Sequence, residues 1–350
     1  MTTVTTERTR RRIYKVLKGG VLAVTFILLI LPTGCEEPPP AEYLFRYRFQ
    51  ADEILNYNAT MDGKGEVTLT TSSRKKEAEE ITLPVEFKGR FSLEAVIDSV
   101  SSTGTAGISV SYKDFSCMIT NRVRDRETTM LLTDQMMRIE ESGRIKKELK
   151  AGESGFPLNG IVGSSFEIEV DSRGKLIQAQ VPPDPGKDFP YMKLDNILDQ
   201  IQPEFPLAPI PVGTSWSREV KVSPPESGRP WNRGQFWTIK LDSTFRGFKE
   251  GGDRIAIIDL SGNFKQSVNP EDSKAQLSGL KQSSHTLTGT IDFDLEKGVV
   301  LSSHTALEQE LDILMAIEQI AKGSKIKVHI KDSTSIKVKL VASEKTKTAD

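Results

Sequence analysis

Serine and histidine recur together in the sequence, as Ser-Ser-His-Thr at residues 283–286 and again at 302–305. A serine nucleophile needs a histidine base within hydrogen-bond reach and an acid that orients this base. Both tetrapeptides fall in strand-like stretches, where neighbouring residues point to opposite faces, so Ser284 and His285 should diverge. We therefore interpret the repeat as strand composition and predict no catalytic residue.

Metal and cofactor chemistry find no support in the spacing of the histidines and cysteines. The three histidines lack an HxH or HxxxH spacing, whereas a zinc site needs three or four convergent ligands. The glycines of residues 160–165 are not followed by the lysine of a phosphate-binding loop. We predict neither metal nor cofactor. His285 shares its parity with Ile291 and Phe293, so it is expected to face inward.

Residues 1–34 have the three parts of a secretory signal peptide. Residues 7–18 hold six basic residues and one acidic residue, and residues 19–31 carry no charge. This apolar run is too short for a membrane-spanning helix, which needs about 20 apolar residues. Gly34 then stands directly before Cys35, one of only two cysteines in the chain.

The Gly34–Cys35 step resembles the lipobox of bacterial lipoproteins, with Pro32 at the third position before the cysteine, where leucine is usual. The resemblance implies that Cys35 receives diacylglycerol and becomes the mature N-terminus. Residues 35–42 would then form a lipidated, proline-rich tether. The protein would face the periplasm or the cell exterior, from either membrane of the envelope. An ordinary cleaved signal and an uncleaved anchor are the alternatives.

The charge balance is not that of a nucleic-acid-binding protein. The chain has 47 basic and 48 acidic residues; without residues 1–34 these become 41 and 47, a net charge of −6. Such a protein lacks both the basic footprint of nucleic-acid binding and a polybasic membrane anchor. Membrane attachment is therefore expected through the lipid on Cys35. Residues 9–15 loosely resemble a twin-arginine export signal, and an ordinary basic signal region is the alternative.

Alternation with period two dominates the rest of the chain and indicates half-buried strands. Ile291, Phe293 and Leu295 point one way while the acidic residues between them point the other, and residues 325–343 repeat the pattern. We predict a mainly β fold of two related antiparallel sheet units, arranged as a sandwich or an open barrel. Cys117 is expected in the core, beyond a β-bulge near residues 113–114.

Two proline-rich stretches, residues 181–190 and 203–213, divide the chain because they cannot form interior strands. We predict an N-terminal β-rich unit over 43–181, a linker over 182–212, a C-terminal β-rich unit over 213–343 and a polar tail over 344–350. The linker should contain a short helix, because four apolar residues follow the i, i+3, i+4, i+7 spacing of one helix face. These residues are Leu194, Ile197, Leu198 and Ile201.

Two similar hairpins suggest that the two β-rich units are related. Residues 165–180 and 290–303 each hold three alternating apolar residues, a charged turn ending in glycine and a return strand, and the turn glycines are Gly174 and Gly298. The alternative is that unrelated β-hairpins look alike. Residues 305–323 fit both a long strand and a helix that ends at a glycine. We predict a strand, because the flanking hairpins need partners.

The order of these elements resembles a bacterial group of uncharacterised lipoproteins known only as a domain of unknown function. The likeness rests on FPLAPIPVGTSW at residues 205–216, on the strands that follow it, and on IDFDLEKGVVLSS at residues 291–303. The resemblance implies a β-rich protein of the cell envelope and supplies no catalytic residues.

These observations favour a non-catalytic binding protein. Tryptophan often anchors interfaces, so we predict a ligand or partner surface at Trp231 and Trp237, together with the apolar face of the helix in the linker. The ligand would be a lipid or acyl chain held on a curved sheet, with residues 191–202 as a lid, an architecture that resembles the periplasmic lipoprotein carriers.

Two other functions remain open. One is a structural or assembly protein of the envelope that binds a protein partner, and the other is a hydrolase with an unrecognised site. An internal apolar pocket would favour the carrier, whereas a filled core with an exposed apolar patch would favour the assembly protein.

Overall fold

A computed structural model describes residues 41–73, 76–123, 125–159, 163, 165–180, 203–222, 235–251, 254–268, 279–316 and 325–345. The chain divides into two units, Met1–Ala41 and Glu42–Asp350. Everything below concerns the second unit, and the predicted signal peptide and Cys35 lie outside the described residues.

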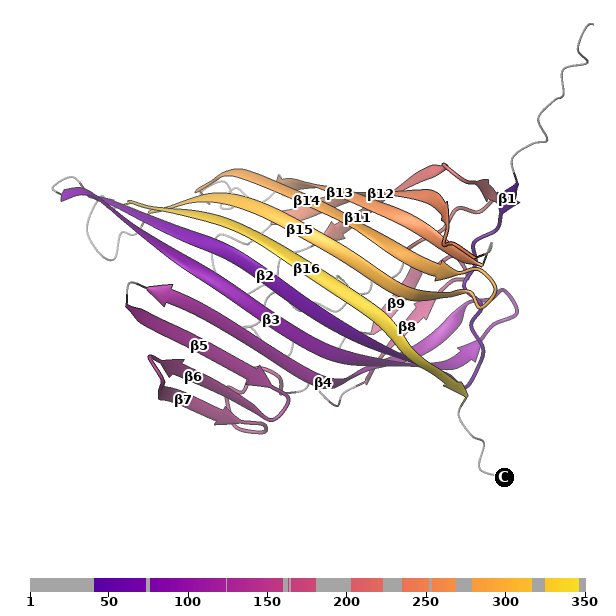
Figure 1. Cartoon of the computed structure of the whole chain (residues 1–350), viewed down its shortest axis with the longest axis horizontal. Helices are drawn as coiled ribbons and strands as arrows, with labels where there is room; N and C mark the ends of the chain where they lie inside the picture. Colours follow the sequence, from indigo (N-terminus) through magenta and orange to yellow (C-terminus); the bar gives the residue numbers. More distant parts are fainter. Residues whose placement is uncertain are drawn as a thin grey trace, which may run out of the picture. The chain divides into compact units, whose positions relative to one another are not determined.

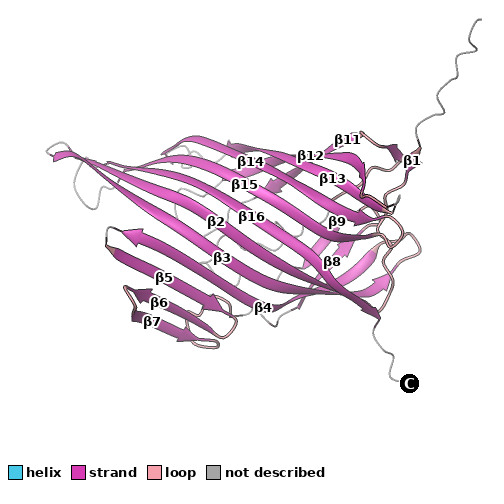
Figure 2. Ribbon diagram, viewed as in Figure 1, coloured by secondary structure: helices cyan, strands magenta, loops and turns pink. Residues whose placement is uncertain are grey.

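Strands make up most of the described chain, and no helix occurs within those ranges (Figure 2). The prediction of a mainly β fold is confirmed. The strands are β1 Glu42–Tyr43, β2 Glu53–Ser73, β3 Lys76–Val100, β4 Ala106–Val123, β5 Arg126–Thr133, β6 Met136–Glu141, β7 Arg144–Lys150, β8 Ser165–Val170, β9 Leu176–Gln180, β10 Ile210–Pro211, β11 Ser215–Val222, β12 Gln235–Phe248, β13 Ile255–Val268, β14 Gly279–Asp294, β15 Val299–Ala316 and β16 Lys325–Lys345.

Fourteen of these strands form one antiparallel sheet (Figure 1). Its order is β11-β12-β13-β14-β15-β16-β2-β3-β4-β5-β6-β7. The sheet forks at β4, because Ala106–Ser111 pair with β8 while Ser116–Val123 pair with β5. β9 extends the β8 branch, and β1 pairs with β10 in a separate two-stranded sheet.

The strands expected in two separate units therefore belong to a single sheet. β16, near the end of the chain, pairs with β2 from Lys325 opposite Ser72 to Lys345 opposite Glu53. An alternating pattern fixes which side chains share a face, but it does not say which strand lies next to which. Pairing β16 with β2 satisfies two strand edges that separate units would leave open. The predicted helix over 191–202 lies outside the described residues.

Several local predictions are confirmed. The turns of both hairpins contain a glycine in the left-handed region, Gly174 at φ +89° and Gly298 at φ +67°. The register between β3 and β4 shifts opposite residues 113–114, as expected for a bulge there. Residues 305–316 continue β15 as a strand. The proline-rich stretch 203–213 contains only the two-residue β10.

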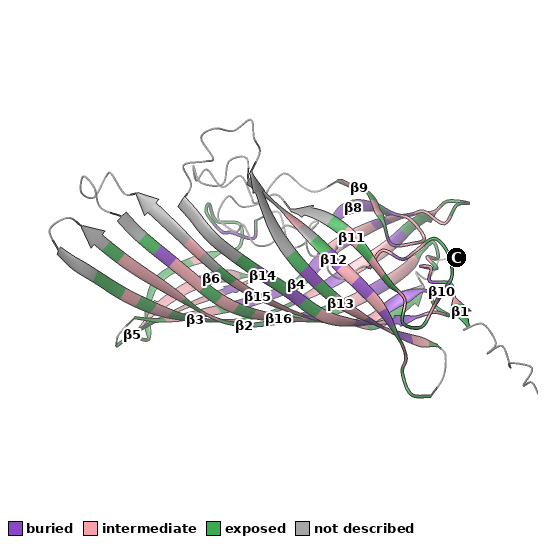
Figure 3. Cartoon of the chain, turned by 90° about the horizontal axis from the view of Figure 1, so that it is seen from above, coloured by how far each residue is buried: buried purple, intermediate pink, exposed green. Residues whose placement is uncertain are grey.

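Alternate residues of the long strands face the side of the sheet on which the core lies, which we call the inner face (Figure 3). One cluster of buried side chains joins β2, β3, β4 and β8, and a second gathers around Phe45, Phe205, Phe245 and Phe293. Cys117 belongs to the first cluster, which confirms the prediction that it is a core residue. No helix of the described chain is long and apolar enough to span a membrane.

Candidate ligand-binding cavity

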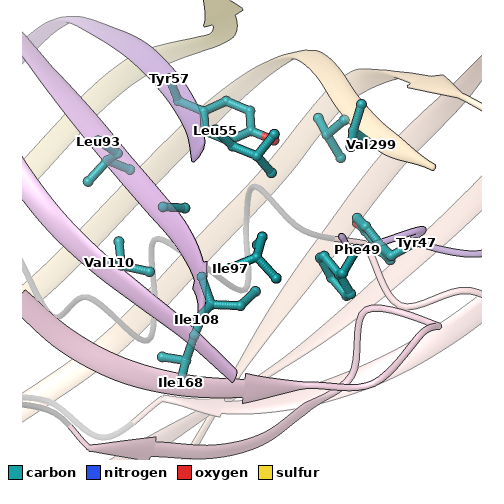
Figure 4. Close-up of a pocket in the computed structure, with 12 residues that line it drawn as sticks. Tyr47, Phe49, Leu55, Tyr57, Leu93, Ile97, Ile108, Val110, Ile168 and Val299 are labelled. Carbon is teal, nitrogen blue, oxygen red and sulfur yellow. The ribbon is translucent and has the colours of Figure 1, made fainter. Parts of the chain in front are cut away.

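An apolar cavity lies against the inner face, near the turn between β3 and β4 (Figure 4). Ile97 and Ile108 lie on one side of the cavity, and Tyr47 and Phe49 lie on another. The complete lining is Tyr47, Phe49, Leu55, Tyr57, Leu93, Ala95, Ile97, Ile108, Val110, Ile168, Val299 and Val300.

The strand register brings most of this lining together. Leu55 of β2 lies opposite Ala95 of β3, which lies opposite Val110 of β4. Residues directly opposite one another in an antiparallel pair place their side chains on the same face. Such cross-strand rows of aliphatic side chains make a continuous apolar wall.

A chain segment that precedes the long strands closes the end of this wall. The rings of Tyr47 and Phe49 stack with centroids 5.5 Å apart. The amide N–H of Tyr47 donates to the carbonyl of Ser172 at 2.7 Å, and that of Arg48 donates to the carbonyl of Gly298 at 3.2 Å. The segment is thus held between the turns of the two similar hairpins.

Both turns require glycine because the segment that contains Tyr47 and Arg48 passes close to their backbones. A Cβ added to Gly174 would lie 2.5 Å from the Tyr47 ring, and one added to Gly298 would lie 2.4 Å from the backbone nitrogen of Arg48. Both glycines also have positive φ, a conformation that costs other residues free energy. The similarity of the two hairpins therefore has a structural role, since each turn contacts one side of the segment that contains Tyr47 and Arg48.

Aromatic packing fixes the same segment from within. Phe45 is almost fully buried, and its ring centroid lies 5.1 Å from that of Phe205, 4.9 Å from Phe245 and 6.0 Å from Phe293. Aromatic pairs at such distances add stability beyond the area they bury. The cluster holds Tyr47 and Phe49 in place at the cavity.

The cavity wall contains no group that is charged near neutral pH. Its only side-chain polar atoms are the hydroxyls of Tyr47 and Tyr57. Burial raises the pKa of both phenols, so both stay neutral. The Tyr47 hydroxyl already donates to the carbonyl of Pro203 at 3.3 Å. Such a wall suits hydrocarbon and offers no acid, base or nucleophile.

The cavity is small but large enough for part of an apolar chain. Its volume is about 70 Å³, whereas a cavity for one water molecule needs roughly 10–15 Å³ on the same measure. An apolar cavity of this kind does not hold water firmly, because water would find few hydrogen-bond partners in it.

A row of polar side chains interrupts the inner face farther along the sheet. Asp332 of β16 lies opposite Gln309 of β15, which lies opposite His285 of β14. Gln309 Nε2 donates a hydrogen bond to Asp332 Oδ2. Burial lowers the pKa of His285 and a hydrogen bond with Gln309 raises it, with burial the larger influence. We call these three residues the polar row.

The sequence predicted only the inward direction of His285, which is confirmed. Gln309 and Asp332 were missed, although a signal exists. Both occupy the apolar parity of their strands, Gln309 two residues after Leu307 and Asp332 two residues after Ile330. A polar residue on the apolar parity is the kind of exception that marks a site.

Most other residues predicted for the site lie outside the part of the chain that the structure describes. Trp231, Leu194, Ile197, Leu198 and Ile201 lie outside the described residues. The backbone of Trp237 is in β12, opposite Val222 and Gln266, and its side chain is outside the described part.

In both Ser-Ser-His-Thr repeats, the histidine and the serine directly before it lie on opposite faces of the sheet. Ser284 is exposed whereas His285 is buried, so their side chains diverge as predicted. His304 of the second repeat is exposed, and its Nε2 lies 3.0 Å from the hydroxyl of Ser335. No group of three metal-ligating side chains occurs in the part of the chain that the structure covers.

The fold thus defines a protein built on one long antiparallel sheet with an apolar cavity at one end. No family model matches the chain, and no curated protein matches it. Among solved structures, the chain is similar to one described as lipid–protein interactions in lipovitellin, with a TM-score of 0.44 and 11% identity over 87% of this chain. The chain spans 26% of that lipovitellin chain.

Two structures of Pseudomonas aeruginosa proteins give lower scores. OccK7 (OpdD) has a TM-score of 0.15 at 8% identity and OccK8 (OprE) 0.11 at 6% identity, with 81% and 82% of this chain covered and 98% and 97% of theirs. None of the three assigns the chain to a family.

Proposed function

We propose that this chain is a lipid-anchored, non-catalytic protein of the bacterial cell envelope that binds an apolar ligand, a lipid or an acyl chain, on the inner face of its sheet. The observation that carries the proposal is the cavity wall, in which ten of the twelve lining residues are hydrocarbon or phenyl side chains and the other two are neutral tyrosines. Apolar pockets of this kind are the default sites for apolar ligands.

The leader supports the location. A basic stretch, a short uncharged run and a glycine–cysteine step at residues 34–35 precede a proline-rich tether. A lipid on Cys35 would hold the sheet beside a membrane, where acyl chains are plentiful. The membrane itself would then supply both the anchor and the ligand.

The experiment compares lipid carried by the full chain and by two variants. Each is expressed in a bacterial host and purified in an amphipathic polymer, and non-covalent lipid is extracted and measured per mole of protein. The lipid on Cys35 is covalent and stays with the protein. Ala95→Phe fills the cavity, and Val96→Phe places the same ring on the opposite face of the same strand.

We expect Ala95→Phe to lose most of the extractable lipid and Val96→Phe to keep it. Lipid from the surrounding membrane is common to all three proteins and cancels in the comparison. Equal lipid in all three would refute binding in the cavity. Absence of lipid from the unsubstituted chain would favour the assembly-protein alternative, and crosslinking would then identify the partner.

A further inference from the structure

The polar row lies between two pairs of aliphatic residues on the inner face. Toward the cavity the next row contains Leu307 and Leu287, which are directly opposite each other. Away from the cavity the next row contains Ile330 and Val67, also paired. Burying polar groups among such side chains costs free energy unless each group finds a partner.

One atom of the row has no such partner. Asp332 Oδ1 is buried and accepts no hydrogen bond from any residue that the structure describes, whereas Oδ2 accepts one from Gln309. Burial raises the pKa of Asp332, and the hydrogen bond from Gln309 lowers it, with burial the larger influence. The row therefore presents a buried acceptor to the inner side of the sheet.

The neighbouring strand leaves room beside this acceptor. Gly65 of β2 lies opposite Asp332, and a Cβ on Gly65 would come within 2.7 Å of the Cβ of Asp332. Glycine inside a strand weakens it and often marks a place where a ligand or another part of the chain approaches closely. Here it removes the side chain that would otherwise crowd the carboxyl.

We infer that the polar row binds the polar end of the apolar ligand, and that this end is an uncharged hydrogen-bond donor such as the free hydroxyl of a diacylglycerol. The hydroxyl donates to Asp332 Oδ1. The inference rests on the proposed function and specifies its ligand. A phosphate headgroup is disfavoured, because the row holds a carboxyl group and no cation, and like charges at short range repel.

The distance along the sheet leaves room for acyl chains between the polar row and the cavity. From Tyr57 at the cavity to Gly65 beside Asp332, β2 runs for eight residues, about 26 Å at ~3.3 Å per residue. One leaflet of bilayer hydrocarbon is about 15 Å thick. A ligand held at the polar row therefore has room to lay its chains along the inner face, over residues such as Leu307, Ile336 and Val338, with their tips toward the cavity.

The test measures how the full chain, in amphipathic polymer, binds three probes with the same two acyl chains. The probes are dioctanoylglycerol, its acetate ester, in which the hydroxyl is capped, and dioctanoyl phosphatidic acid. Each displaces a fluorescent fatty acid. We expect the unsubstituted chain to prefer dioctanoylglycerol over the acetate by at least about tenfold, because a buried acceptor left without its donor is costly. Phosphatidic acid should bind more weakly than dioctanoylglycerol.

Two variants test whether the preference for dioctanoylglycerol over its acetate ester depends on Asp332. Asp332→Leu should bind the acetate as before and lose the preference for the hydroxyl, bringing the ratio near one. Asp312→Leu removes a carboxyl from the other face of the sheet, where Asp312 accepts from His329, and should keep the preference.

Each outcome separates the two claims. Equal affinity of the unsubstituted chain for dioctanoylglycerol and the acetate, or tighter binding of phosphatidic acid, would overturn the inference and leave apolar binding intact. Failure to bind any of the three would overturn the inference, and the lipid extracted from the full chain would decide the proposed function separately. Because the preference is measured first on the unsubstituted chain, a variant that does not fold cannot rescue the inference.

Discussion

The closed end of the inner face and the polar row belong to the same sheet but are built in opposite ways. At the closed end, aliphatic residues from β2, β3, β4 and β8 meet aromatic rings from residues 45–49, and the tyrosine hydroxyls stay neutral. At the polar row, a carboxyl, an amide and an imidazole occupy three neighbouring strands in one register. One region excludes water, whereas the other keeps an acceptor for a hydrogen-bond donor.

The contrast shows how one alternating pattern can supply two functions. Every second residue of each strand faces inward. One polar residue at the matching position in each of three neighbouring strands therefore creates a polar row without disturbing the fold. The aromatic segment cannot be made this way, because it comes from outside the sheet and depends on two hairpin turns. We therefore expect stability to depend mainly on the closed end and ligand selectivity mainly on the polar row.

The largest effect should come from the aromatic segment. Phe45→Ala removes a ring that is 1% exposed, and such truncations cost about 3–5 kcal/mol. Because Phe45 holds Tyr47 and Phe49 at the cavity, the variant should also carry less lipid. Urea unfolding measures the stability, and Leu44→Ala, at a residue that is 51% exposed, is the control, expected to cost about 0.5 kcal/mol. Similar losses in the two variants would mean that the segment does not stabilise the closed end.

The turns that hold this segment should show the next largest effect. Gly298→Ala and Gly143→Ala both place alanine at positive φ, but only Gly298 has a backbone atom within 2.4 Å of the new Cβ, and nothing lies within 4 Å of Gly143. The positive φ destabilises both variants to a similar extent, so the difference between their free energies of unfolding measures the effect of the contact with Arg48. We expect the free energy of unfolding of Gly298→Ala to be about 1–3 kcal/mol lower than that of Gly143→Ala. If the two variants are equally stable, the segment moves aside without cost.

How much of this could be predicted from sequence depends on the range of the interaction. Period-two alternation predicted the strands, the inward direction of His285 and the bulge at residues 113–114, because these are local properties of the backbone. The pairing of β16 with β2 could not be predicted, since any two alternating strands fit equally well. The sequence predicted an apolar binding site but not the residues that line it, because the walls of the cavity come from strands and a segment that are distant in sequence.

The tryptophans and the helix face drew attention in the sequence because large apolar residues are conspicuous there. Gln309 and Asp332 are ordinary in composition and unusual only in parity, so they become visible once the register of their strands is known. The same holds for Tyr47, whose role depends on the turns at Gly174 and Gly298. Sites assembled by sheet register are thus harder to predict than sites marked by a motif.

The smallest expected effect is a difference between the two faces of the sheet in how a buried or paired aspartate makes stability depend on pH. Burial raises the pKa of Asp332 on the inner face, whereas a hydrogen bond with His329 lowers the pKa of Asp312 on the outer face. A raised carboxyl pKa favours the folded state below the unfolded value of about 4, and this contribution is lost as the pH rises through the folded pKa. A lowered pKa favours folding above the unfolded value and is lost as the pH falls through the folded pKa.

Asp332→Asn should therefore be more stable than the unsubstituted chain at pH 7, by roughly 0.5 kcal/mol after allowance for solvent screening of a half-buried group, and equal to it at pH 3. Asp312→Asn should be less stable than the unsubstituted chain at pH 7, and this difference should be smaller at pH 3. Urea unfolding of the three proteins at both pH values measures these differences. If Asp332→Asn is instead less stable at pH 7, the carboxylate has a partner on the inner face that offsets its burial, and the polar row would then be a structural network with no acceptor left for a ligand.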